Sequence, residues 1–76
     1  MKAYVLVSIR TGDVKEVVAH LRRVPQVIEA NMTFGPYDAV AVVETEDINN
    51  VGKILANEIQ PIPGILDTLT CLAVDV

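Results

Sequence analysis

Cysteine, histidine and tryptophan are scarce in this chain of 76 residues, which contains one cysteine, one histidine and no tryptophan. A single cysteine cannot form an internal disulfide, and one histidine with one cysteine is too small a ligand set for structural zinc. A domain of this size buries only about 60 to 65% of its unfolded surface, yet 51% of its residues are hydrophobic. Because neither a disulfide nor a metal can stabilise it, we expect self-association into at least a dimer.

Basic residues are also few, with six Lys and Arg against ten Asp and Glu and a net charge of −4. Binding to nucleic acid depends on cations that neutralise phosphates, so direct nucleic-acid binding is not expected. The basic residues are most concentrated at Arg22 and Arg23. We expect these two arginines at the end of a helix, where cations complement the helix dipole.

Long apolar runs are missing as well. No segment approaches the roughly 20 residues of a membrane span, and the N-terminal run 4–9 is short, ends at Arg10 and lacks a small-residue cleavage site. We therefore expect a cytoplasmic protein that does not associate with membranes, a compartment in which the unpaired thiol of Cys71 is ordinary.

The hydrophobic pattern predicts one domain over residues 1–76 with the order β-α-β-β-α-β. Strands are expected at residues 4–9, 27–34, 38–45 and 65–76, with one helix between Asp13 and Pro25 and another beginning at Asp47. This order defines an α+β, ferredoxin-like fold, in which a four-stranded antiparallel sheet carries both helices on one face.

Local patterns predict which residues face the core. Glu16 completes a capping box with Asp13, and the acidic run of Glu44, Glu46 and Asp47 is explained by a helix N-terminus rather than by a metal site. The expected helical stripes are Val14, Val17, Val18 and Leu21, then Ile48, Val51, Leu55 and Ile59 with Ile54 beside them. In the second strand, Ile28, Ala30, Met32 and Phe34 are expected on one side and Val27, Glu29, Asn31 and Thr33 on the other.

The sheet has more apolar surface than two helices can cover. In the third strand, Ala39, Ala41 and Val43 alternate with Val40 and Val42, so both faces are apolar. An antiparallel sheet with one wet face alternates apolar and polar residues instead. The second face must be buried, and a face-to-face dimer of two identical sheets is the simplest solution.

Two segments could bind a small zwitterion. The first, residues 33–38, ends a strand, turns at Gly35-Pro36 and places Asp38 where the chain re-enters the sheet. The second, Pro63-Gly64-Ile65 followed by Thr68 and Thr70, is a turn that leads into the last strand. Together they offer a carboxylate, backbone N–H groups and hydroxyls.

These two motifs, in this strand order and over essentially the whole chain, resemble the RAM domain, the effector-binding half of the Lrp/AsnC transcription regulators. The chain looks like a stand-alone form that starts at the first strand, without the helix-turn-helix. The resemblance implies dimers formed through the sheets, rings of dimers such as octamers, and an amino-acid effector bound between dimers against the loop at residues 35–38. The sequence also departs from the family pattern: Phe34 stands before Gly35 where many members have threonine, and Thr33 lies one residue earlier.

The resemblance gives Gly35, Pro36, Tyr37, Asp38, Thr68 and Thr70 as ligand-binding residues. Structural explanations remain open for each of them: a positive φ at Gly35, a stiffened turn at Pro36, an interface contact by Tyr37, a turn capped by Asp38, and strand propensity at the threonines. In the binding interpretation, Asp38 pairs with the ligand ammonium.

The function predicted is a non-enzymatic, oligomeric amino-acid-binding module without cofactor or metal, acting on transcription regulators or amino-acid metabolism through partners such as a full-length Lrp/AsnC protein. One alternative is a small dimeric α+β-barrel enzyme, which would need an acid or base in a polar cavity; His20 and Cys71 are not expected to meet. The other is an oligomerisation module without ligand.

Overall fold

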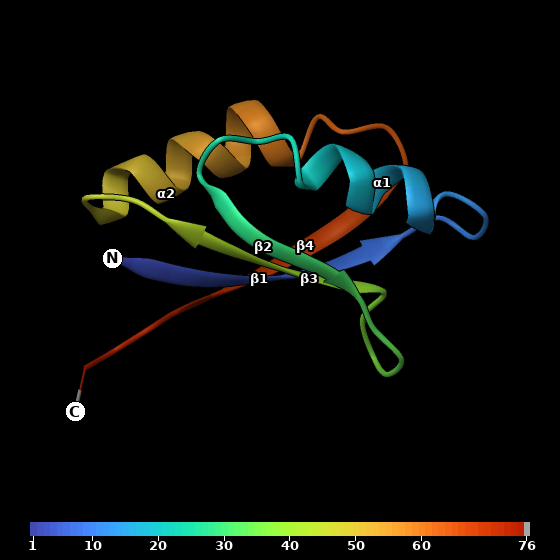
Figure 1. The fold of residues 1–76 in the computed structure, drawn as a ribbon, viewed down its shortest axis with the longest axis horizontal. Coiled ribbons are helices and arrows are strands. Elements are labelled where there is room, and N and C mark those ends of the chain that lie inside the picture. The colour runs from blue at the N-terminus through green and yellow to red at the C-terminus, as the bar shows by residue number, and fades with distance from the viewer. Residues whose placement is uncertain (76) are drawn as a thin grey trace.

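A four-stranded antiparallel sheet with two helices on one face forms the fold in the computed structural model, which describes residues 1–75 (Figure 1). The elements are β1 (Lys2–Ile9), α1 (Val14–Leu21), β2 (Val27–Met32), β3 (Ala39–Glu44), α2 (Ile48–Ile54), the π-helical turn η1 (Leu55–Ile59) and β4 (Ile65–Leu72). The strand order is β2-β3-β1-β4. The predicted element order and ferredoxin-like class are confirmed. The last strand ends at Leu72, whereas the prediction extended it to Val76, which lies outside the described residues.

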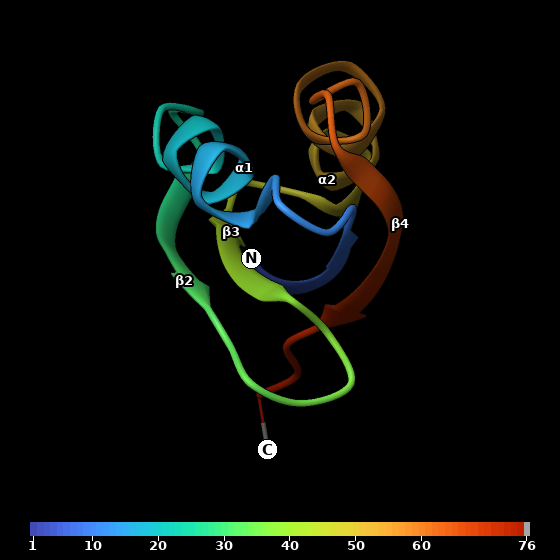
Figure 2. The same ribbon diagram turned by 90° about the vertical axis from the view of Figure 1, so that its right-hand side faces the viewer.

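Both helices lie on the same side of the sheet, and the opposite face is left without a covering layer in residues 1–75 (Figure 2). The core lies between the helices and the sheet. Its members are fully or nearly fully buried: Val5, Val7, Ala39, Ala41 and Val43 from the sheet, with Val17, Val18, Leu21, Val51, Ile54 and Ile59 from the helices. The stripe predicted for α1 is confirmed. No helix in residues 1–75 has the length and apolar character that crossing a membrane requires.

The open face carries apolar side chains, as the alternation in the sequence predicted. Tyr4 and Leu69 are exposed, and Leu6, Val40 and Val42 are half-buried. Leu6 pairs with Val40 on one side and with Leu69 on the other, so these side chains form a continuous strip across three strands. We call the surface formed by these five residues the open sheet face.

A bulge in β2 makes the faces of that strand differ from the predicted ones. Val27 pairs with Val43 and Glu29 with Val42, so Ile28 is an extra residue on β2. One extra residue inverts the alternation. Val27 and Ala30 are therefore both buried, although they were predicted on opposite faces, and Ile28 is exposed.

The two predicted helix caps have different outcomes. Asp47 has extended dihedral angles (φ −152°, ψ 170°), and its Oδ1 accepts a hydrogen bond from Asn50 N at 3.0 Å, so this cap is confirmed. Asp13 does occupy the N-cap position of α1, but the predicted capping box was wrong: with φ −104° and ψ 2° the residue lies outside the extended region, and its side chain makes no capping hydrogen bond. Its carboxylate instead forms an ion pair with Arg10 Nε at 2.8 Å.

The second helix buries a different stripe from the predicted one. Val51, Ile54 and Ile59 are buried and Leu55 is half-buried, as expected, but Ile48 at the first turn is 53% exposed. Gln60 N donates to Leu55 O at 2.8 Å, which closes a π turn. A π turn joins residues five apart by a hydrogen bond and is wider than an α-helical turn, and both Ile54 and Ile59 are buried in the core.

Substitution of Gly64 should destabilise the fold. Gly64 has a φ of +101°, and a Cβ there would lie 3.0 Å from Asp13 Cβ and 3.1 Å from Val17 Cγ2. We expect Gly64→Ala to lower the free energy of unfolding by about 1 to 3 kcal/mol, measured by urea denaturation followed by circular dichroism.

Gly52→Ala is the matched control. Gly52 lies within α2, and a Cβ there would meet nothing within 4 Å. Alanine at this position should leave the unfolding free energy unchanged or raise it by about 0.5 to 1 kcal/mol. Equal stability of the two variants would contradict the steric argument.

Candidate ligand-binding site

The loop between β2 and β3 projects from the side of the sheet opposite the helices (Figures 1 and 2). Thr33 closes its base, because Thr33 Oγ1 donates to Tyr37 O at 2.8 Å and Thr33 N donates to Asp38 O at 3.0 Å. Gly35 has a φ of +142°, so the corner needs glycine, as the structural interpretation predicted. A Cβ at Gly35 would meet nothing within 4 Å, so the backbone there is also open to approach.

Asp38 is fixed by the neighbouring strand rather than by its own turn. Its Oδ2 accepts a hydrogen bond from Ile9 N at 2.7 Å, and its backbone N donates to Val7 O at 2.9 Å. A carboxylate offers about four acceptor positions on two oxygens. Asp38 is half-buried, so Oδ1 can still accept a hydrogen bond from a cation while Oδ2 holds the side chain in place.

A small hollow lies under the loop, with a cavity volume of about 210 Å³. Its lining residues come from the loop and from the open sheet face: Leu6, Thr33, Phe34, Gly35, Pro36, Tyr37 and Val40. None of these side chains is charged. Phe34 is fully exposed at its edge, whereas Tyr37 is half-buried. Asp38 does not line the hollow but follows Tyr37 directly.

The two threonines of β4 lie away from this loop. Thr68 pairs with Val7 and Thr70 with Val5, and both valines are buried against the helices. The threonines therefore share the helix-covered side of the sheet, where Thr68 Oγ1 accepts a hydrogen bond from Gln60 Nε2 at 3.4 Å. Neither threonine lines the hollow under the loop, which projects from the other side of the sheet.

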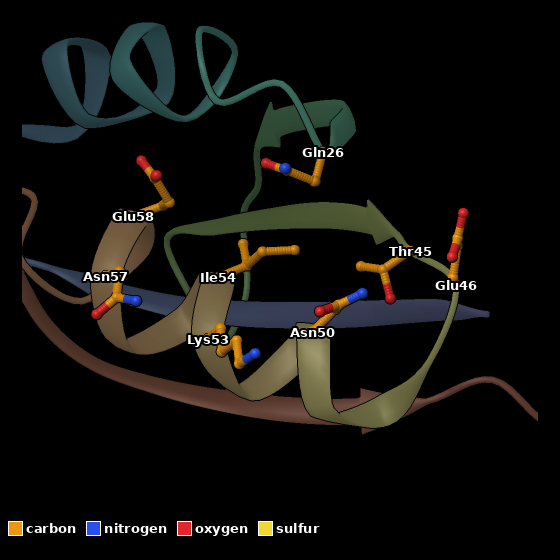
Figure 3. Close-up of a pocket in the computed structure, with 8 residues that line it drawn as sticks. All are labelled: Gln26, Thr45, Glu46, Asn50, Lys53, Ile54, Asn57 and Glu58. Carbon is orange, nitrogen blue, oxygen red and sulfur yellow. The ribbon is translucent and has the colours of Figure 1, made fainter.

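A larger, polar groove of about 560 Å³ lies on the helix side and was not foreseen from the sequence (Figure 3). Asn50, Lys53, Ile54, Asn57 and Glu58 of α2 and η1 line it, together with Gln26, Thr45 and Glu46 from two turns. The helical spacing of Asn50, Lys53 and Asn57 is a signal that could have indicated it. Ile54 lies at its centre, and Gln26 faces the helix from the α1–β2 turn.

The charges of this polar groove are not fixed. Lys53, Glu46 and Glu58 are exposed, and none of them forms an ion pair within residues 1–75. Asp38, by contrast, has its position set by a backbone hydrogen bond. We therefore place the candidate site at the loop, where the geometry is determined before any ligand binds.

The two side chains weighed for a nucleophilic pair, His20 and Cys71, lie on different sides of the sheet. His20 lies on α1, whereas Cys71 pairs with Tyr4 on the open face, so the sheet separates them, as expected. Cys71 is exposed in the single chain rather than packed as a small apolar residue. Within residues 1–75, no group of three or more His, Cys, Asp and Glu side chains is placed to hold a metal ion.

The Thr33 hydroxyl should stabilise the loop. Thr33→Val removes its bond to Tyr37 O, and we expect the free energy of unfolding to fall by about 1 kcal/mol, with faster amide exchange of Thr33 itself. Thr70→Val is the control, since its hydroxyl makes no hydrogen bond within residues 1–75. Urea denaturation with hydrogen exchange measures both effects, and equal losses in the two variants would contradict this role.

The strand order and the two helices define a ferredoxin-like α+β domain. The comparison with known families makes this specific: residues 2–76 match the Lrp/AsnC ligand binding domain, and the chain belongs to this family. The resemblance inferred from the two motifs is thereby confirmed.

Individual relatives agree with this assignment. The chain is 32% identical over 75 residues to the HTH-type transcriptional regulator FL11 of Pyrococcus horikoshii, covering 95% of this chain and 47% of that protein. The chain thus spans about half the length of the curated relatives it matches.

Solved structures share the fold. The structure of TTHA0845 from Thermus thermophilus has a TM-score of 0.93 and 31% identity, with 99% of this chain and 94% of that chain covered. The transcriptional regulator NMB0573 from Neisseria meningitidis, solved as a complex with L-Met, has a TM-score of 0.87 at 22% identity, with 97% of this chain and 49% of that chain covered. At that identity the likeness concerns the fold alone.

Proposed function

We propose that the chain is a non-enzymatic, oligomeric amino-acid-binding module of the cytoplasm that regulates transcription through protein partners. Asp38 carries this proposal: its carboxylate is held by Ile9 N while one oxygen remains able to receive an ammonium group. The family supports it as well, because residues 2–76 match the Lrp/AsnC ligand binding domain and the curated relatives are transcriptional regulators.

The ligand carboxylate would be bound by backbone N–H groups of the loop. Within residues 1–75, the N–H groups of Gly35 and Tyr37 donate no hydrogen bond, and Pro36 between them has no N–H. The missing Cβ at Gly35 lets an anionic group come close to them. A zwitterion thus meets a carboxylate at one end and two backbone donors at the other.

Thr68 and Thr70 would join the site from a different chain. They lie on the helix-covered side of β4, an edge strand, where a neighbouring molecule can reach them. A ligand at such a junction stabilises the assembly that contains it, in proportion to its difference in affinity between the assembled and separate states. A full-length Lrp/AsnC regulator with a matching sheet would be the partner that receives the signal.

The charge of Asp38 should be needed for binding. Asp38→Asn keeps an oxygen for Ile9 N but removes the negative charge, so we expect an amino-acid affinity lower by about tenfold or more. Isothermal titration calorimetry across the common amino acids, first on the unsubstituted protein and then on the variant, measures this.

Glu46→Gln removes the same charge from the polar groove and is the matched control. Its affinity should equal that of the unsubstituted protein. Loss of binding in Glu46→Gln, with Asp38→Asn unaffected, would move the site to the polar groove. No binding by the unsubstituted protein would leave the oligomerisation module as the function.

The open sheet face should form the dimer. Leu69 is 50% exposed on that face, and Ile48 is 53% exposed on the helix side. Leu69→Lys places a charge in the proposed interface and should give monomers in analytical ultracentrifugation, because a buried unpaired charge is costly. Ile48→Lys makes the same change at equal exposure and should leave the dimer intact; dissociation by Ile48→Lys instead would place the interface on the helix side.

A further inference from the structure

The polar groove on the helix side is lined by three side-chain carboxamides (Figure 3). Asn50 and Asn57 belong to the helical segment, and Gln26 faces this segment from the α1–β2 turn. Within residues 1–75 none of these side chains forms a hydrogen bond: Asn50 donates to Asp47 through its backbone N–H, and Gln26 accepts from Glu44 through its backbone oxygen. Because each carboxamide offers two donors and an acceptor oxygen, the groove has hydrogen-bonding capacity that the chain itself does not use.

The two asparagines indicate the shape of a ligand. Asn50, Lys53 and Asn57 recur at intervals of three and four residues, so they share one face of the helical segment. The asparagines lie about 10 Å apart along the helix axis, which is the span of about three residues of an extended chain. Ile54 lies between them at the centre of the groove. The groove therefore fits a long, narrow ligand with polar groups at intervals and an apolar group over Ile54.

A peptide main chain matches this lining better than a nucleotide does. None of the lining residues is aromatic, whereas exposed bases are commonly bound by stacking on aromatic rings. Lys53 is the one cation of the lining and is accompanied by the carboxylates of Glu46 and Glu58, so a phosphate would meet more negative than positive charge. A main chain alternates N–H donors with carbonyl acceptors, and a carboxamide can pair with both.

The charges of the groove favour a basic ligand. Glu46 and Glu58 are exposed and form no ion pair within residues 1–75. We propose that the polar groove binds an extended, basic peptide segment of a partner protein, whose main chain pairs with Asn50 and Asn57 and whose apolar side chain lies on Ile54. This inference goes beyond the proposed function, because it concerns the helix side of the sheet and requires no amino-acid effector.

Nuclear magnetic resonance titration of the full chain with defined peptides tests the proposal. The probe is a short, blocked peptide that alternates leucine and lysine. Saturable shifts are expected for the side-chain NH₂ signals of Gln26, Asn50 and Asn57. The same peptide with glutamate in place of lysine should bind about tenfold more weakly or less. Methylation of the backbone nitrogens of the lysine peptide should weaken binding by a similar factor, because the peptide then has no N–H groups to donate.

The double variant Asn50→Ala/Asn57→Ala removes both carboxamides from the helical face. It should bind the lysine peptide about tenfold more weakly, the effect of a few lost hydrogen bonds. Asn49→Ala is the matched control, because Asn49 is exposed on the same helix but does not line the groove; it should leave the affinity unchanged. Lys53→Gln should tighten binding by about two- to fivefold, as expected for one exposed charge.

Absence of binding of the lysine peptide to the unsubstituted protein would overturn the proposal. So would equal affinity for the glutamate peptide, unchanged binding after backbone methylation, or unchanged binding by the double variant. Amino-acid binding, measured by calorimetry, should be the same in the double variant as in the unsubstituted protein. Failure of this proposal and failure of the proposed function are therefore separate results, the first seen with peptides and the second with amino acids.

Discussion

The hydrophobic effect acts on both faces of this sheet, but the chain covers only one of them. Val5, Val7, Ala39 and Ala41 are buried under the helices, while the open sheet face presents Leu6, Val40 and Leu69 without a covering layer in residues 1–75. A small domain with so much apolar surface gains stability when a second copy covers that face. We therefore propose that a second copy covers this face, and the loop at residues 33–38 projects on the side where that copy would lie.

The hydrogen bond from Ile9 N to Asp38 joins the candidate site to the sheet itself. Ile9 ends β1, the strand that pairs with both β3 and β4, and it pairs with Ile65 at the start of β4. Asp38 leads directly into β3. A ligand bound by Asp38 would therefore be connected to β1 through the hydrogen bond from Ile9 N and to β3 through the chain itself.

Much of the fold was predictable because its signals are local. Apolar spacing located α1, and the Gly35-Pro36 corner located the loop. The failures share a cause, which is that strand pairing and side-chain contacts, neither of which the apolar spacing reports, decided the outcome. The bulge at Ile28 depends on pairing with β3, and the charge of Arg10 draws the Asp13 carboxylate away from the helix cap. The same holds at the site, where Thr33 closes the loop on Tyr37 although its position in the sequence favoured no such role. The polar groove was missed because it combines Gln26 with residues 45–58.

The position of Thr68 and Thr70 follows from register alone, and it has a functional consequence. Pairing with Val7 and Val5 puts both threonines on the helix-covered side, whereas the loop with Asp38 projects on the other. In the proposed site, Asp38 and the two threonines come from different chains. A ligand of this site would bind the assembly and not the separate chain, and by reciprocity the assembly would bind the ligand more tightly. Sensing in this domain would then require no conformational switch within the chain, because formation of the junction between chains would be the response.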